Sequence, residues 1–412
     1  MRILLAINNL GTGGAETFFC QQARALAEKG HKVFIWQVFY PVFNHQYQEV
    51  LNHNNISEFE FPREDTEFLC RESRKIRRIW VARKLRRKIN FLKIDVVNSH
   101  LFETDYFIST YANLPHVISM HGSYEMYYHN RDVYKKDSYY GSNDFNELVT
   151  LIFKKSNYII TAAQKNEETI LVHPKVPPHR MIYYGKSAIN LVNQSKSVRN
   201  IGMISRGIES KGWNLLIESF KQLSNTYKDI TLTLGYTASE YMDKLKKENE
   251  GVANINWKRD VTDLTSFFKD LDLFVFPTRY PAESLPNVVI ESLAYQIPVI
   301  STDIGEIPNM LSSKEGYAGI ILSKNFNDRE LIENLRNEIE NLCNVPPIGR
   351  IRSKKREICI NPGCNRVVIA RPVVGIGHQF VALATHHGRD FCVGFIVDKP
   401  IHHMRARAFQ TP

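Results

Sequence analysis

Two glutamates eight positions apart, Glu283 and Glu291, stand in a stretch that follows an apolar run. Pro286 indicates a helix start between them, because proline is tolerated where a helix N–H has no partner. The N–H groups of such a start can hold a phosphate, and Glu291, inside the helix, can accept hydrogen bonds from both hydroxyls of a ribose. The residues predicted at this helix start are Leu285, Pro286, Asn287 and Val288.

Two cations form a second candidate group. Arg206 and Lys211 follow the apolar run Asn200–Ser205 on a glycine-flanked segment that opens a helix. Two cations and a helix N-terminus at one strand end suit a diphosphate. The alternative is a pair of solvated surface cations, and in either case we expect both side chains on an exposed loop.

A glycine-rich segment directly follows the apolar run Arg2–Ile7 and ends at Glu16. Gly13 and Gly14 let the backbone approach a ligand closely and turn sharply into a helix, although a plain tight turn is an equal alternative. A dinucleotide-binding fingerprint fits poorly, because Glu16 occupies the place of its third glycine.

Two histidines follow predicted strands, His121 after His116–Ser119 and His100 after Asp95–Ser99. Ligands of parallel α/β sheets bind where the carboxyl ends of the strands meet. His121 is therefore predicted to face the site, with a hydrogen-bonded structural histidine as the alternative. His100 is the weaker candidate, for which a structural role is favoured.

Short apolar runs alternate with helix-length segments, which predicts parallel sheets with helices on both faces. The first strands are Arg2–Ile7, Lys32–Phe39, Asp95–Asn98, His116–Ser119 and Tyr158–Thr161. A second series follows at Asn200–Ser205, Ile230–Gly235, Asn254–Trp257, Leu273–Phe276, Pro298–Ser301 and Gly319–Leu322. Helices are predicted at Glu16–Lys29, Asn214–Leu223 and Pro286–Tyr295.

A chain of 412 residues exceeds what one hydrophobic core normally spans. We therefore expect an α/β protein of two Rossmann-like, doubly wound domains that face a cleft. The predicted boundaries are an N-terminal domain at 1–186, a linker at 187–198, a C-terminal domain at 199–344 and an atypical basic tail at 345–412.

Composition narrows the function classes. The tail holds 11 Lys and Arg against 3 Asp and Glu, which leaves 42 of 53 against 40 of 43 for the rest of the chain. That near-neutral body argues against a nucleic-acid partner. Six scattered cysteines make no disulfide framework, and Cys359 with Cys364 lacks the second pair of a zinc site. No membrane span or signal-peptide core is found, so a cytoplasmic protein is expected.

In this order the motifs resemble those of glycosyltransferase family 4, retaining enzymes of GT-B architecture. The resemblance covers roughly residues 1–343 and is carried by Gly11–Glu16, Arg206 with Lys211, Glu283 with Glu291, and Pro298–Ile307. The chain departs from the family at Ser284-Leu285, where Gly-Phe or Gly-x is frequent, at Gln296, where glycine is usual, and at Tyr184-Gly185, where Asn-Gly is frequent.

The resemblance implies a UDP- or GDP-sugar donor, bound mainly by the second domain, and a glycan or lipid-linked acceptor. Arg206 and Lys211 would neutralise the leaving diphosphate, and Glu283 would hold hydroxyls of the donor sugar. His121 would hydrogen-bond near the transferred sugar, Glu291 would bind the ribose, and Gly13 and Gly14 belong to the donor-binding set. We expect no metal or other cofactor, because no D-x-D motif is suitably placed and two cations can replace a metal.

The expected process is synthesis of cell-surface polysaccharide, and three alternatives remain open. A nucleotide-sugar epimerase of the same fold would convert the donor without an acceptor. A glycogen- or sucrose-type synthase would use a soluble acceptor. A non-catalytic protein would bind the nucleotide sugar without turnover.

Residues 71–93 contain eleven basic residues and one acidic residue, Glu72. The segment predicts an amphipathic helix that can lie on an anionic membrane surface, which would make the protein peripheral on the inner face of the cytoplasmic membrane. The alternative is a domain helix that packs its apolar side inward. The apolar residues predicted to lie largely on one side of the helix are Ile76, Ile79, Trp80, Leu85, Ile89 and Leu92.

The family resemblance ends near Cys343, and Val345–Gly349 cannot extend a helix smoothly. Arg366–Ile376 and Phe391–Asp398 are possible strands of the tail. An accessory module, a basic extension and an unrelated sequence joined by an insertion or frame change are the alternatives. We favour the third, because the closing helix of the family is missing where it should begin.

Overall fold

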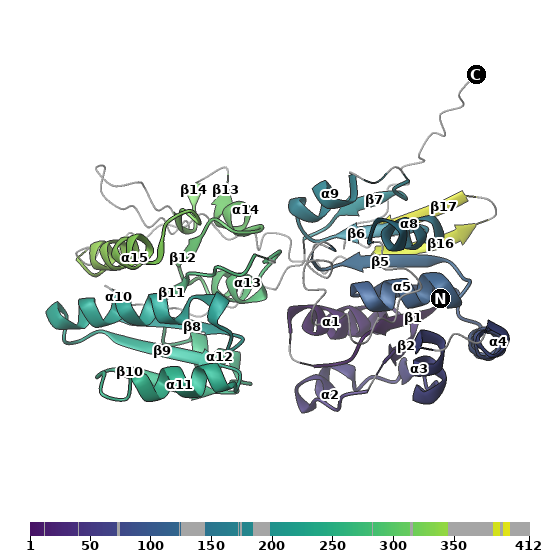
Figure 1. The fold of residues 1–412 in the computed structure, drawn as a ribbon, viewed down its shortest axis with the longest axis horizontal. Helices are drawn as coiled ribbons and strands as arrows, with labels where there is room; N and C mark the ends of the chain where they lie inside the picture. The colour runs from purple at the N-terminus through teal and green to yellow at the C-terminus, as the bar shows by residue number, and fades with distance from the viewer. Residues whose placement is uncertain are drawn as a thin grey trace, which may run out of the picture.

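The computed structural model describes residues 1–344, apart from 12, 40, 72–74, 123, 125–144, 172, 174, 184–197, 282 and 314–315, and two tail strands at 382–387 and 390–395. Two α/β domains lie side by side along the long axis of the molecule (Figure 1). Each domain is built on one parallel sheet, which confirms the predicted fold class. The predicted linker 187–198 lies outside the described residues, except for Val198.

The first sheet has the strand order β3-β2-β1-β4-β5-β6-β7, and every neighbouring pair is parallel. The order reverses between β1 and β4, a switch point where doubly wound sheets bind their ligands. The strands are β1 Arg2–Ile7, β2 Lys32–Gln37, β3 Ile56–Glu58, β4 Val96–His100, β5 His116–Met120, β6 Tyr158–Thr161 and β7 His179–Met181. The helices are α1 Gly14–Glu28, α2 His45–Leu51, α3 Arg63–Arg71, α4 Lys75–Phe91, α5 Phe102–Tyr111, α8 Phe145–Lys155 and α9 Gln164–Leu171.

The second sheet has the order β10-β9-β8-β11-β12-β15 and is also parallel, with its switch point between β8 and β11. The strands are β8 Asn200–Ser205, β9 Thr231–Tyr236, β10 Ile255–Arg259, β11 Leu273–Phe276, β12 Val299–Thr302 and β15 Gly319–Leu322. The helices are α10 Trp213–Thr226, α11 Glu240–Glu248, α12 Leu264–Phe268, α13 Asn287–Ala294, α14 Ile307–Leu311 and α15 Asp328–Cys343. A 3₁₀ turn, Glu209–Lys211, precedes α10, and a short hairpin pairs β13 Ser312–Ser313 with β14 Gly316–Tyr317.

Strand β1 shows why the strands are continuous apolar runs. Alternate residues of a strand point to opposite faces of the sheet. Ile3 and Leu5 pack with Phe19 of α1 on one face, and Leu4 packs with Leu85 of α4 on the other. Both faces are covered by helices, so an apolar residue is needed at every position of the strand.

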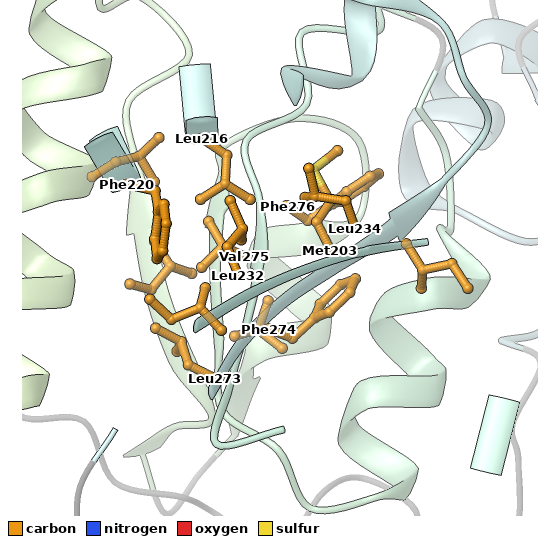
Figure 2. Close-up of a cluster of buried hydrophobic side chains, with 14 of the residues drawn as sticks. Met203, Leu216, Phe220, Leu232, Leu234, Leu273, Phe274, Val275 and Phe276 are labelled. Carbon is orange, nitrogen blue, oxygen red and sulfur yellow. The ribbon is translucent and has the colours of Figure 1, made fainter. Parts of the chain in front are cut away.

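The core of the second domain follows the same rule. Figure 2 shows side chains of β8, β9 and β11 packed in one apolar cluster with Leu216 and Phe220 of α10. Trp213 and Phe220 are fully buried there. This packing anchors the strands whose carboxyl ends carry the candidate site.

All strands predicted in the two domains are present, with ends that differ by at most two residues from the prediction. The prediction for 71–93 is wrong in one respect, because its apolar residues do not share one side of a helix. At 3.6 residues per turn, Leu85 and Ile89 lie on one side of α4 and Trp80 on the opposite side. The inward residues are Val81, Ala82, Leu85 and Ile89, whereas Ile79, Trp80 and Phe91 are exposed.

In the tail, β16 Ala382–His387 pairs antiparallel with β17 Asp390–Phe395. Strand β17 overlaps the predicted strand Phe391–Asp398, whereas the predicted strand Arg366–Ile376 lies outside the described residues. Among the helices that are described, none combines the length and the apolar character needed to cross a bilayer.

Gln296 stands in left-handed backbone, with φ of 60°. Helix α13 ends here in a Schellman motif, in which Ile297 N–H donates to Ser292 O (3.0 Å) and Gln296 N–H to Leu293 O (2.9 Å). This geometry explains why a glycine is usual at the position.

We predict that Gln296→Gly raises the free energy of unfolding by roughly 0.5–1 kcal/mol, because relief of left-handed strain exceeds the backbone entropy cost of glycine. Urea denaturation measures the change, and Gln296→Ala, which keeps a Cβ, is the matched control. Equal stability of the glycine and alanine variants would contradict the explanation.

Candidate functional site

The two switch points face each other across the domain interface. The loop after β1 begins α1, and the Nδ2 atom of Asn287, the first residue of α13, donates to Gly14 O (3.2 Å). A Cβ on Gly14 would lie 3.3 Å from that nitrogen, so a larger residue would require the Asn287 side chain to shift by a few tenths of an ångström. A Cβ on Gly13 would meet the Glu16 carboxylate. Both glycines therefore allow close packing of this loop.

A buried ion pair lies at the centre of the site. Lys211 Nζ contacts Glu283 Oε2 at 2.5 Å, with side chains only 4% and 9% exposed. Thr278 Oγ1 donates to the same oxygen (3.1 Å), and the ammonium lies 4.3 Å from the centroid of the Tyr280 ring. Burial lowers the pKa of Lys211, and the Glu283 carboxylate partly offsets this shift.

The prediction that Lys211 lies on an exposed loop is wrong. The 3₁₀ turn carries Lys211 inward, and Gly212 follows with φ of 82°. A Cβ on Gly212 would collide with Pro277 O at the end of β11. The turn therefore packs tightly against the strand that leads to Glu283, and this packing buries the lysine.

Arg206 is exposed, as predicted, at the end of β8. Its guanidinium lies 5.1 Å from the Tyr280 ring centroid, so one aromatic ring faces both cations. Burial raises the pKa of Glu16 in the first domain, and its own backbone N–H and the charge of Arg206 oppose this shift. A cationic surface next to a helix start suits a diphosphate.

Helix α13 starts beside this pair, with Pro286 as its N-cap and Asn287 as its first residue. The first N–H groups of a helix have no partner within the helix, so they are available to an anion. Leu285 precedes the start and is buried, and Val288 follows it. Glu291, one turn further, is buried on the inner face of the helix.

His121 follows β5 and is hydrogen-bonded to His100. His100 Nδ1 lies 2.7 Å from His121 Nε2, and the two rings stack with centroids 5.0 Å apart. Burial lowers the pKa of His121 to about 3, so its imidazole is neutral at physiological pH. The residue that the sequence favoured as structural, His100, is in direct contact with the predicted site residue.

One side chain links the histidine to the ion pair. Asn166 of α9 donates from Nδ2 to Met120 O (3.3 Å) and to Ser284 Oγ (3.2 Å). Met120 precedes His121 and Ser284 follows Glu283, so the two predicted groups meet across the interface. No motif in the sequence marked Asn166.

Glu306 provides a further link between the domains and is 1% exposed. Its Oε2 accepts from Gln164 N (2.9 Å), the first residue of α9, and its Oε1 accepts from the Tyr183 hydroxyl. Its own N–H donates to Ser284 O (2.8 Å). Glu306 belongs to the family-like run Pro298–Ile307, which is the only sequence signal that pointed to it.

The described residues contain no group of three or more His, Cys, Asp or Glu side chains that could hold a metal ion. Metal independence stays a prediction. The site combines two cations (Arg206 and Lys211), the start of α13, the buried carboxylate of Glu283 and the neutral imidazole of His121.

Comparisons with known proteins indicate the family of the chain. The family model Glycosyltransferase Family 4 matches residues 12–185, and the model Glycosyl transferases group 1 matches residues 198–341. The chain is 32% identical over 126 residues to the capsular polysaccharide biosynthesis glycosyltransferase CapM of Staphylococcus aureus, a match that covers 28% of this chain and only 31% of CapM. It is 22% identical over 338 residues to an uncharacterized glycosyltransferase of Haemophilus influenzae, which covers 80% of this chain and 88% of that protein.

A solved structure, Anabaena HepE in complex with UDP-glucose, has a TM-score of 0.60 and 16% identity and covers 82% of this chain and 89% of its own. The two family models match the two domains in the order in which they occur along the chain. The chain therefore belongs to glycosyltransferase family 4 and has the GT-B fold.

Proposed function

We propose that this protein is a retaining glycosyltransferase that moves a sugar from a UDP- or GDP-sugar to a glycan or lipid-linked acceptor, in the synthesis of cell-surface polysaccharide. The observation that carries the proposal is the cluster of Arg206, Lys211 and Glu283 beside the start of α13. The similarity to CapM, a capsular polysaccharide biosynthesis glycosyltransferase, supports the process, and the complex of HepE with UDP-glucose supports the class of donor.

The donor diphosphate is placed against Arg206, Lys211 and the first N–H groups of α13. Negative charge grows on the diphosphate as its bond to the sugar breaks. Preorganised cations and N–H dipoles stabilise that charge without moving, which is the largest single term in many enzymes. Two cations at this position make a divalent metal unnecessary, so we expect transfer in the presence of EDTA.

Glu283 then has two roles. Within the described part of the chain, both side-chain hydrogen bonds to its carboxylate end on Oε2, from Lys211 and Thr278. The arrangement orients Oε1 to accept from hydroxyls of the donor sugar. The carboxylate also holds the Lys211 ammonium beside the diphosphate through their 2.5 Å contact.

A donor panel tests the proposal. The purified full chain is incubated with UDP-, GDP- and ADP-sugars, with and without lipid extract, and the free nucleotide is measured. Nucleotide release from one donor only when the extract is present supports transfer. Donor conversion without acceptor indicates an epimerase, release with a soluble sugar acceptor indicates a synthase, and binding without turnover indicates a non-catalytic protein.

Glu291 gives a prediction about donor binding. We expect Glu291→Ala to raise the donor KM about 10-fold or more, because hydrogen bonds to a charged group contribute roughly 1.5–3 kcal/mol. The change in kcat should be smaller, since the ribose is bound equally before and during transfer. Steady-state kinetics measure both values, with Glu291→Gln as the conservative control. An unchanged KM in the alanine variant would remove Glu291 from the site.

We also propose that α4 holds the protein on the inner face of the cytoplasmic membrane. Its outward face combines Ile79, Trp80 and Phe91, which are 51%, 61% and 84% exposed, with exposed Arg83 and Arg87. Aromatic residues interleaved with cations are typical of helices that lie on anionic bilayers. The inward face of α4 packs in the domain core, as expected for a domain helix. The outward face remains available to contact lipid.

The full chain is expected to cosediment with vesicles that contain phosphatidylserine and not with neutral vesicles, and to be released by salt. Trp80→Ser with Phe91→Ser should weaken binding at least about 10-fold, because burying one large apolar side chain contributes roughly 1.5–3 kcal/mol. Phe43→Ser is the matched control, since Phe43 is 68% exposed outside α4. Equal sedimentation with both vesicle types would contradict the membrane role.

A further inference from the structure

A chain of hydrogen bonds runs from the sheet to His121. It begins at Asn98 of β4, passes through His100 at the end of the same strand and reaches His121 after β5. Asn98 and His100 are buried, and neither was assigned a role in transfer. The direction of each hydrogen bond in this series follows from the orientation of the Asn98 amide.

The amide of Asn98 can lie only one way round. Its Nδ2 lies 3.0 Å from Val117 O on the neighbouring strand β5. A carbonyl oxygen only accepts, so the atom that faces it must be the NH₂ group. The other amide atom, Oδ1, then faces His100 Nε2 at 3.0 Å. Because Oδ1 only accepts, His100 carries its proton on Nε2.

The protons on the two imidazoles follow from this assignment. Burial holds the pKa of His100 well below its usual value, so the ring is neutral and its Nδ1 has no proton. His121 Nε2 lies 2.7 Å from that nitrogen and must therefore donate. A neutral His121 with its proton on Nε2 has a lone pair on Nδ1.

We propose that Asn98 and His100 are positioning residues that hold His121 as the neutral Nε2–H tautomer, so that His121 Nδ1 accepts a hydrogen bond from a hydroxyl of the sugar in transfer. The consequence for transfer rests on the proposed function, whereas the tautomer does not. A hydroxyl is the ligand because a neutral acceptor nitrogen cannot hold a carboxylate or phosphate. The Asn166 bridge joins Met120, the residue before His121, to Ser284, the residue after Glu283.

Aromatic side chains hold the two rings in this orientation. Phe18 of α1 packs its edge on His121, with centroids 5.4 Å apart, and Phe19 packs on His100 at 5.1 Å. A ring flip of His100 would place Nδ1 and Nε2 on the wrong partners and cost both hydrogen bonds. These contacts therefore fix the tautomer of His121 before any ligand binds.

The tautomer is measured directly on the free protein. In the full chain labelled with ¹⁵N-histidine, long-range ¹H–¹⁵N spectra separate protonated from bare ring nitrogens, and loss of a signal in His121→Phe assigns His121. We expect protonated Nε2 and bare Nδ1 at neutral pH. A protonated Nδ1, or a cationic ring, would overturn the proposal whether or not transfer is observed.

Variants of His100 test the consequence for transfer. Asparagine places an amide oxygen near the position of Nδ1, whereas phenylalanine fills the space without an acceptor. His100→Phe should lower kcat about 10-fold with little change in donor KM. A loss of this size is at the lower end of the effects seen when a residue that orients a functional side chain is replaced. His100→Asn should recover most of that loss.

A double variant separates positioning from general damage. In the His121→Phe background, His100→Phe should lower kcat no further, because its effect passes through His121. Independent losses in the two variants, or full kcat in a folded His100→Phe, would overturn the proposal. If His100→Phe does not fold, the spectra of the unmodified protein still decide the tautomer. Absence of transfer from every donor in the unmodified protein would instead reject the proposed function.

Discussion

Replacing Lys211 by methionine is expected to lower kcat for sugar transfer at least about 10²-fold, because one preorganised charge at the leaving group is lost. The same change should lower the free energy of unfolding by about 3–5 kcal/mol, since it leaves a buried carboxylate without its partner. The 2.5 Å contact with Glu283 Oε2 and the burial of both side chains are the reasons. Steady-state kinetics and urea denaturation measure the two effects.

A double-mutant cycle separates catalysis from stability. Lys211→Met with Glu283→Gln removes both charges, and replacing a whole buried pair is often close to neutral for stability. The double variant should therefore recover most of the stability while transfer stays low. Recovery of activity together with stability would show that Lys211 acts only through folding, and normal turnover of Lys211→Met would remove it from the site.

Glu306→Ala is expected to lower kcat/KM about 10²-fold, the size of loss that follows from displacing a catalytic group by about 1 Å. Glu306 accepts from Gln164 N and the Tyr183 hydroxyl, so its loss removes one of the contacts that tie the start of α9 to the second domain. Asn166 on that helix carries the bridge to Ser284. Donor binding, which depends on second-domain residues, should change much less when measured by calorimetry.

Asn309→Ala is the matched control for this variant. Asn309 Nδ2 also donates to Glu306 Oε1 (2.7 Å), but it belongs to the same domain as Glu306. Asn309 also hydrogen-bonds to Tyr183, but its removal leaves the contact of Glu306 with Gln164 N in place, so kcat/KM should fall much less than in Glu306→Ala. Equal losses of kcat/KM in both variants would mean that activity depends on the local packing around Glu306 and not on its contacts between the domains.

The fold could be predicted because its main signal is local. Strands of a sheet covered on both faces are continuous apolar runs, and helices between them make the sheet parallel. β1 and β11 therefore stand out without any knowledge of their neighbours. The orientation of α4 could not be predicted, since counting apolar residues does not tell which side of a helix the core covers.

The site could be predicted as a set of residue types at strand ends, but not as a set of contacts. The burial of Lys211 depends on Glu283, 72 positions further along the chain. Asn166 meets Ser284 across 118 positions and carries no motif. His100 was assigned a structural role because a lone buried histidine commonly has one, and its contact with His121 depends on the pairing of β4 with β5. Such partners become visible only once the two sheets are placed.

The central claim is that a nucleoside diphosphate binds to Arg206, Lys211 and the start of α13 without a metal. Isothermal titration of UDP and GDP into the full chain, in EDTA, tests it most directly. We predict saturable binding of one nucleotide at a single site, which is lost when Arg206→Ala is combined with Lys211→Met and Glu283→Gln. Binding that requires a divalent cation, or that survives unchanged in the triple variant, would contradict the account.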